Sequence, residues 1–232
     1  MIAINHNAKV IFNCPESHIE RFMLKYDMFR GATDIYEDED GFVLNDYPNY
    51  DVMSLYKDVP AFVGIDVGGE GAVVSMNAEG EVIDKYVVPK IGNVVDLHLL
   101  SKYIIMCKGA KVAIEDVHSI FGTSSKSNFK FGFASGAMEA LLVAHSIAFE
   151  RVAPKAWQKV AWQGVHIVST ATGKRLKSGA MQTKVDTKGT SLLAAKRLFP
   201  TLDLRASERC KIPHDGIVDA LLMAEYARRT LK

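Results

Sequence analysis

Short apolar runs separated by turn residues open the main part of the chain. Ala61–Val67, Ala72–Met76 and Val82–Val88 are rich in valine, and only glycine-containing turns such as Asn77–Gly80 lie between them. Runs of this length and composition, bounded by turn residues, are typical of β-strands. Because strands joined by such short turns cannot run parallel, the pattern predicts an antiparallel meander of three strands.

Helical and strand-like periodicity alternate after the meander. Two further apolar runs predict strands at Lys111–Glu115 and Ala148–Val152. Helices are predicted at Asp96–Cys107, Phe133–Ser146, Pro154–Ala161, Thr187–Leu198 and Asp215–Arg229. This order predicts an α/β domain with a mixed five-stranded sheet, an antiparallel meander followed by parallel strands, and helices on both faces. It matches the RNase H-like fold, whereas a Rossmann domain places a helix after its first strand.

The pattern before residue 59 predicts a small separate unit. Ala8–Phe12 is strand-like, Pro15 and the apolar residues behind it favour a helix, and Glu37–Asp40 is an acidic turn. Pro48 and Pro60 disfavour helix and mark a linker. We therefore divide the chain into an acidic N-terminal appendage, residues 1–58, whose role the sequence does not reveal, and an RNase H-like domain, residues 59–232.

Composition narrows the class of protein. Apolar residues make up 48% and charged residues 24% of the chain, as in ordinary globular proteins. With no run of about 18 apolar residues and no leader-like N-terminus, the expectation is a cytoplasmic protein, in the nucleoid or in a host cell if phage-encoded, without membrane contact. Cys14, Cys107 and Cys210 stand far apart, which argues against a disulfide framework or a zinc site.

Charge is distributed unevenly along the chain. Residues 1–58 hold 5 Lys/Arg and 11 Asp/Glu, residues 59–232 hold 23 and 16, and residues 151–211 hold 13 and 3. A block this basic points to a polyanionic partner, and a solvated lysine-rich surface is the alternative.

Two acidic residues stand where predicted strands end. Asp66 follows the apolar residues of the first strand, and Glu115 ends the fourth. A carboxylate among apolar residues is costly unless it is paired or bound to a metal. An ordinary turn aspartate and an ordinary acid at the sheet rim are the alternatives. Asp116 points to the opposite side of its strand and is not expected to take part.

Two more acids belong to the last helix. Asp215 and Asp219 are four residues apart, so both project from one face. Like charges at this spacing repel each other, and a divalent cation relieves the repulsion. A capping Asp215 with a solvent-facing Asp219 is the alternative. His214 is expected to cap the helix or hydrogen-bond locally, with a metal-ligand or proton-shuttle role as its alternative.

The first strand, the fourth strand and the last helix adjoin in an RNase H-like sheet. Asp66, Glu115, Asp215 and Asp219 are therefore predicted to form one catalytic and metal-binding site. Hard oxygen ligands suit Mg²⁺, with Mn²⁺ as a substitute, and no His/Cys set competes for zinc. Two such ions about 4 Å apart would activate water and stabilise the leaving oxygen of a phosphodiester.

Four segments of the chain resemble the RuvC-like Holliday-junction resolvases, in particular their phage-type branch. They are Gly64-Ile65-Asp66 with Gly71-Ala72, Val112–Glu115, Val152–Gln158 and His214–Leu222. The resemblance implies that the four acids bind the catalytic metals and that the enzyme acts as a homodimer. It also implies a structure-selective DNA endonuclease that resolves four-way junctions or other branched DNA by paired nicks, leaving 5′-phosphates.

Three features depart from that family. Some relatives space the last two acids by three residues instead of four. The stretch Val165–Asp186 is longer than usual, and residues 1–58 have no counterpart. These additions bear on junction specificity more than on nuclease chemistry.

Two segments are predicted to contact DNA. Ser119–Phe133 is a flexible polar loop beside the acids, and the glycine-rich stretch Gly173–Gly189 is a mobile basic arm. The DNA-binding candidates are Ser124, Lys126, Asn128, Phe129, Lys130, Lys155, Lys174, Arg175, Lys177, Lys184 and Lys188. Stacking on unpaired bases is left open for Phe121 and Phe129, whereas Phe131 and Phe133 are expected to anchor the loop to the core.

Two apolar features carry both a structural and a functional interpretation. Trp157 is expected in the core rather than as a stacking platform for bases. One helix face, comprising Ala137, Ala140, Leu141, Ala144 and His145, suits either the core or a twin helix in a two-fold dimer.

Three other functions fit parts of the pattern. One is an RNase H-like nuclease acting on flaps or RNA–DNA hybrids, and another is a catalytically silent DNA-binding module. The third is a sugar- or acetate-kinase-like phosphotransferase, because Phe62–Met76 resembles the first phosphate loop of the actin-like fold. That fold requires a duplicated domain and a second phosphate loop, which this sequence lacks.

Overall fold

The computed structural model describes residues 60–231 apart from 69, 118–123, 176–177 and 180, together with four strands within residues 1–59. Those strands are β1 (Ile2–Asn5), β2 (Lys9–Phe12), β3 (Ile35–Asp38) and β4 (Gly41–Leu44). They form an antiparallel sheet of their own in the order β1-β2-β4-β3. The strand predicted to end at Phe12 is confirmed, and the helix predicted from Pro15 lies outside the described residues.

A second, mixed sheet organises the rest of the chain. Its order is β11-β10-β5-β6-β7, with β5 antiparallel to β6, β6 antiparallel to β7, and β5, β10 and β11 parallel. The strands are β5 (Phe62–Asp66), β6 (Ala72–Met76), β7 (Val82–Val87), β10 (Lys111–Glu115) and β11 (Phe149–Val152). This is the predicted RNase H-like arrangement, and within the described residues it occurs once, without the duplication that an actin-like kinase requires.

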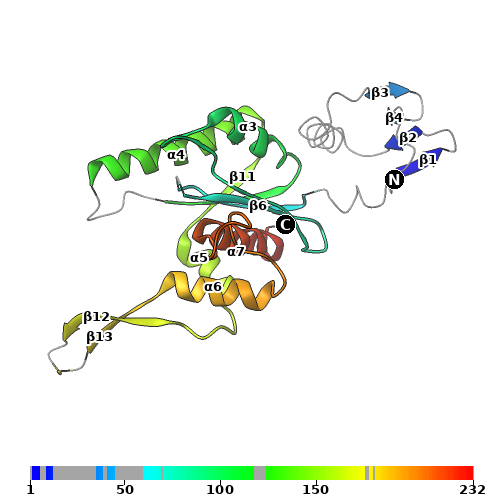
Figure 1. Ribbon diagram of the computed structural model, residues 1–232. Coiled ribbons are helices and arrows are strands. Elements are labelled where there is room, and N and C mark those ends of the chain that lie inside the picture. The colour runs from blue at the N-terminus through cyan, green and yellow to red at the C-terminus, as the bar shows by residue number, and fades with distance from the viewer. Residues whose placement is uncertain are drawn as a thin grey trace.

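Helices cover both faces of this sheet (Figure 1). On one face lie α3 (Leu97–Ile105) and α4 (Ser125–Ala144). On the other lie α5 (Pro154–Ala161), α6 (Thr187–Leu198) and α7 (Asp215–Thr230). Strand alternation divides the sheet's side chains between the two layers, so that Ile65 packs with Leu100 and Met138, whereas Ala113 packs with Trp157 and Leu221. Among the described helices, none has the length and apolar content to span a bilayer.

Glycines allow α7 to lie unusually close to the sheet. A Cβ atom on Gly64 of β5 would stand 2.0 Å from the carbonyl oxygen of Ala220 and 2.3 Å from the amide nitrogen of Ala224. A Cβ on Gly216 would stand 2.4 Å from the carbonyl oxygen of Glu70, in the turn between β5 and β6. Any side chain at either position would push the helix away, so these glycines set the distance between the first strand and the last helix.

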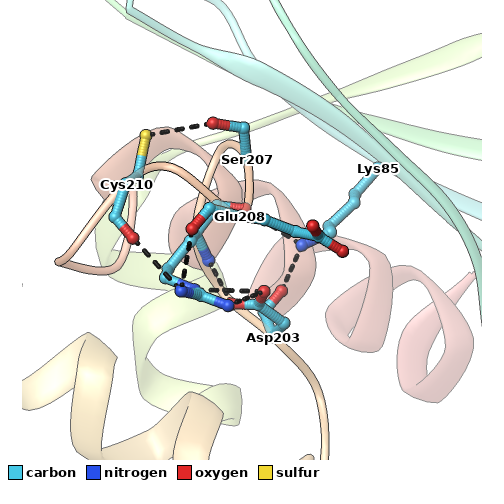
Figure 2. A network of polar contacts seen from close by, with 6 residues as sticks. Lys85, Asp203, Ser207, Glu208 and Cys210 are labelled. Carbon is cyan, nitrogen blue, oxygen red and sulfur yellow. Dashed lines mark hydrogen bonds and ion pairs between the residues drawn. The ribbon is translucent and has the colours of Figure 1, made fainter.

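The loop before α7 is held in place by a polar network (Figure 2). Lys85 of β7 donates hydrogen bonds to the carbonyl oxygens of Asp203 and Arg205. The Arg205 guanidinium in turn binds the Asp203 carboxylate and donates to the carbonyl oxygens of Glu208 and Cys210. This network fastens the loop to the sheet edge and so fixes where α7 begins.

Two parts of the fold differ from the prediction. Helix α4 begins at Ser125, eight residues before the predicted start, because Ser124 caps it by accepting a hydrogen bond from the amide of Ser127 at 3.2 Å. Much of the predicted polar loop is therefore helical. The predicted basic loop is instead a hairpin of β12 (Ser169–Arg175) and β13 (Met181–Val185), and a smaller hairpin pairs β8 (Lys90–Ile91) with β9 (Val94–Val95).

Candidate active site

Asp66 and Glu115 end two neighbouring parallel strands, β5 and β10. The residues just before them, Ile65 and Ile114, are paired in register. Both isoleucines are fully buried on the side of α3 and α4. Because side chains alternate along a strand, both acids face the opposite side, which α7 covers.

Helix α7 brings two more acids to the same edge. Asp215 is its first residue and Asp219 lies one turn later, while Leu221 and Leu222 are fully buried beneath. Asp219 is half-buried and Asp215 is exposed. The close approach of α7 to β5 at Gly64 places the first turns of the helix beside the end of the strand. The predicted convergence therefore follows from the packing of one helix on one strand.

The four carboxylates interact electrostatically. Burial, opposed by a hydrogen bond from the Gly68 amide, raises the pKa of Asp66 to about 6, with a further contribution from Asp215. Burial and the charge of Asp66 raise the pKa of Glu115 to about 7. Burial and the charges of Asp66 and Glu115 raise the pKa of Asp219 to about 7. Desolvation and mutual repulsion both disfavour the ionised forms, so a nearby cation would be strongly favoured.

Trp157 and Lys188 contact the acids directly, which the sequence did not predict. Trp157 is buried, as expected, but its Nε1 also donates a hydrogen bond to Glu115 Oε1 at 3.1 Å. Lys188, predicted to bind DNA, forms an ion pair with Asp215. The sequence signals that could have found these contacts are positional. Trp157 lies in a short helix that follows the fifth strand, and Lys188 lies in the first turn of α6. Trp157 orients Glu115, and Lys188 partly neutralises Asp215.

The side chain of His214 does not make the capping or local hydrogen bond that the sequence predicted. His214 occupies the N-cap position of α7 by its backbone, but its side chain makes no capping hydrogen bond. Its Nδ1 atom is buried and has no hydrogen-bond partner among the described residues. The imidazole therefore stands beside Asp215 with one nitrogen uncommitted.

The donor set fits a hard divalent cation, although the side chains are not arranged as a ready-made site. Within the described part of the chain, no three His, Cys, Asp or Glu side chains stand as a preformed metal-binding group. Carboxylate oxygens are the ligands that Mg²⁺ and Mn²⁺ prefer, and burial and mutual repulsion raise the pKa values of Asp66, Glu115 and Asp219, which a bound cation would offset. Ion binding would therefore reorient some of these side chains.

Comparison with known proteins found similarity among solved structures. No protein-family model and no curated protein matches the sequence. Two solved structures of Thermus thermophilus RuvC are similar at 18% identity over 72% of this chain. The structure in complex with a Holliday junction substrate is covered over 94% of its chain with a TM-score of 0.43, and the other over 95% with a TM-score of 0.44. Similarity at this level carries no argument about activity, which has to be argued from the side chains of this protein.

The predicted DNA-binding residues lie on three elements around the acids. Ser124, Lys126, Asn128, Phe129 and Lys130 belong to the start of α4, Lys155 to α5, and Lys174, Arg175 and Lys184 to the β12–β13 hairpin. All of them are exposed except Asn128, which is half-buried. Phe121 and Lys177 lie outside the described residues. The structure thus leaves these side chains accessible to a polyanion on two sides of the acidic edge.

The phenylalanines of α4 divide differently from the prediction. Phe131 packs against the core as expected. Phe133 was expected to do the same, but 46% of it is exposed, and Phe129 is 76% exposed. Because α4 begins early, these two residues fall one helical turn apart on its outer face. With Lys90 and Val94 of the small hairpin they line an open pocket of about 510 Å³.

Proposed function

We propose that this protein is a Mg²⁺-dependent, structure-selective DNA endonuclease that cuts four-way junctions or other branched DNA by paired nicks, leaving 5′-phosphates. One observation carries the proposal. Asp66, Glu115 and Asp219 come from three separate elements, and burial with mutual repulsion raises the pKa of each. A cluster of like charges that destabilises the folded protein calls for a functional explanation, and binding divalent ions is the simplest one.

Each residue has a role in that chemistry. Asp66, Glu115, Asp215 and Asp219 would hold one or two Mg²⁺ ions, which activate water and stabilise the leaving oxygen when bound. Trp157 keeps Glu115 directed toward the site through its indole N–H. Lys188 holds Asp215 and, once released from it, is placed to contact a phosphate. The exposed lysines of α4 and of the β12–β13 hairpin would attract and orient the DNA backbone.

A substrate panel tests the proposal. Four-way junction, flap, RNA–DNA hybrid and linear duplex are offered with Mg²⁺, and the ends of each product are mapped. We expect nicking of the junction in preference to linear duplex, with ligatable 5′-phosphates. Preferred cutting of flaps or hybrids would move the protein to the other RNase H-like nucleases, and equal cutting of junction and linear duplex would remove the resolvase assignment.

Single substitutions test the site. Asp66→Asn and Glu115→Gln should reduce the cleavage rate by at least about a hundredfold while leaving junction affinity in EDTA unchanged. Asp116→Asn is the matched control, because Asp116 neighbours Glu115 but is expected from strand alternation to face the other side of the sheet. Cleavage that survives Glu115→Gln, or is lost equally with Asp116→Asn, contradicts the assigned site.

The paired nicks require a second copy of the chain, and α4 offers a surface for it. An uncharged stripe of exposed residues runs along its outer face, formed by Phe129, Phe133, Gly136, Ala140 and Val143. Of the face predicted from sequence, Leu141 packs on the core and His145 bonds to Ser101 at 2.8 Å, so the available stripe lies further round the helix. A face of small and apolar residues suits a symmetric helix contact.

Sedimentation analysis tests the homodimer. The unmodified chain should sediment as a dimer, and Val143→Glu should shift it toward monomer by placing a charge in the contact. Leu193→Glu, at an exposed apolar position on α6, should leave the dimer intact. A monomeric wild-type protein, or a dimer unaffected by Val143→Glu, would contradict this interface.

A further inference from the structure

The β12–β13 hairpin extends away from the body of the domain (Figure 1). Every residue of β13 is exposed. In β12 Thr172 is half-buried and the other six residues are exposed. A two-stranded ribbon without a covering layer is marginally stable in water. Among the described residues no layer covers this ribbon, so its surface is available to a partner.

The base of the hairpin is tied firmly to α6. The amide of Val168 donates to Thr190 Oγ1 at 3.0 Å, and the amide of Asp186 donates to the carbonyl oxygen of Val168 at 2.8 Å. Thr190 is fully buried, and the Asp186 carboxylate caps α6 by accepting from the amide of Gly189. Since Lys188 in the same turn pairs with Asp215, the base of the arm is linked to the acidic site through α6.

Charge and hydrogen-bonding groups are concentrated on this arm. Its two strands hold three basic residues, Lys174, Arg175 and Lys184, and no Asp or Glu. Strand alternation and the pairing of Thr170 with Lys184 gather one hydrogen-bonding face, comprising Thr170, Thr172, Gln182 and Lys184. The opposite face carries Ala171 and Val185 together with the polar residues Ser169 and Thr183. A basic ribbon rich in hydrogen-bonding side chains complements a polyanion whose surface offers many hydrogen-bonding groups.

We infer that the hairpin binds a double-helical arm of the DNA substrate by lying in its major groove. The major groove of B-form DNA is wide enough for a two-stranded ribbon and presents both donors and acceptors to threonine, glutamine and lysine side chains. The seven residues of β12 span roughly 23 Å, or about seven base pairs along the duplex. The inference relies on the proposed function only for DNA as the partner.

The arm therefore acts on a part of the substrate that the acidic site does not touch. The site acts on one phosphodiester, whereas the ribbon holds the neighbouring duplex and fixes the direction in which it leaves the site. Its expected contribution is to affinity and orientation, not to the chemical step. This difference allows the two proposals to fail independently.

Methylation protection tests the groove directly, because guanine N7 lies in the major groove. In EDTA, the protein bound to a junction should protect guanine N7 atoms along about seven base pairs of one arm. A variant in which residues 170–184 are replaced by Asn-Gly should lose this protection. Ser169 and Val185 are paired, so a two-residue turn closes the shortened loop.

A charge variant covers the case in which the shortened protein does not fold. Lys174→Gln combined with Arg175→Gln and Lys184→Gln should weaken binding to junctions about tenfold at physiological salt and reduce the salt dependence of binding. Lys102→Gln on α3 is the control and should change neither. Both arm variants should cut the junction more slowly at limiting enzyme, in proportion to their loss of affinity.

Each outcome bears on the inference. Protection that depends on the hairpin supports it, even if Mg²⁺ produces no cleavage and the proposed nuclease function fails. Binding without protection of guanine N7, or unchanged protection and affinity in the arm variants, overturns it. A changed oligomeric state with unchanged DNA binding would also overturn it, because the ribbon would then serve a second copy of the chain.

Discussion

Glu225, near the end of α7, is a buried charge that the fold needs. Only 3% of it is exposed, and its carboxylate accepts hydrogen bonds from Arg228 Nε at 2.7 Å and Arg229 Nε at 2.6 Å. Burial alone would raise the pKa of Glu225, but the two arginines outweigh it and lower the pKa below its ordinary value. The sequence offers no sign of this, because an i,i+3 and i,i+4 arrangement of charges usually lies on a solvated face.

The lowered pKa predicts how stability depends on pH. A depressed carboxyl pKa contributes stability above the unfolded-state value near 4.5, and this contribution is lost as the pH falls through the folded-state pKa. Glu225→Gln should therefore lower the free energy of unfolding at pH 7 by about 2 kcal/mol and flatten its decline between about pH 5 and pH 3.

Urea unfolding across that pH range is the measurement. Glu139→Gln is the matched control, because Glu139 pairs with Arg151 at the surface and should cost less than about 1 kcal/mol. Equal losses in the two variants would show that burial does not distinguish these ion pairs.

At the scale of elements, the contact between α7 and β5 decides whether the acids meet. Gly64→Ala should cost about 3 kcal/mol or more, because the added methyl would overlap the backbone of Ala220 and Ala224. Gly132→Ala is the control, since a Cβ there meets no atom within 4 Å and should raise stability by roughly 0.5–1 kcal/mol through helix propensity. Thermal unfolding of both variants checks this, and a tolerated Gly64→Ala would show that α7 moves freely on the sheet.

The elements differ in how far the sequence predicts them. Strands such as Lys111–Glu115 were predicted to the residue, because apolar runs bounded by turn residues specify both ends. The start of α4 was missed because Ser124–Asn128 is polar throughout and lacks apolar periodicity, although Ser124 is a good N-cap. The β12–β13 hairpin was missed because both of its faces are exposed, so no alternation of apolar and polar residues marks it.

The candidate site was predictable only in part. Asp66 and Glu115 stand out because each follows an apolar run, and their alignment follows from the order of the strands. The hydrogen bond from Trp157 and the ion pair of Lys188 link segments that lie 42 and 27 residues away from their partners. Nothing local to the sequence encodes such contacts, because they depend on how α5 and α6 pack against the sheet.

For the whole molecule, the acidic site is a source of instability when no cation is bound. Ionising Asp66, Glu115 and Asp219 is unfavourable because the three carboxylates are buried and because their negative charges repel one another. A group whose pKa is raised in the folded protein lowers the free energy of unfolding above its unfolded-state pKa, and at pH 8 this penalty is fully present. Removing one charge should therefore stabilise the metal-free protein even as it removes the proposed activity.

Asp219→Asn should raise the free energy of unfolding by about 1–2 kcal/mol, as measured by urea unfolding at pH 8 in EDTA. This figure is smaller than a direct conversion of the raised pKa of Asp219 into free energy. Mg²⁺ at about a hundred times its dissociation constant should then stabilise the wild-type protein by about 2.7 kcal/mol and the variant far less. Asp203→Asn provides a control of opposite sign, because its partner Arg205 lowers the pKa of Asp203, so this variant should be destabilised in EDTA and keep the full Mg²⁺ response. If Asp219→Asn were less stable than wild type without metal, or responded equally to Mg²⁺, the four acids would be structural rather than ion-binding groups.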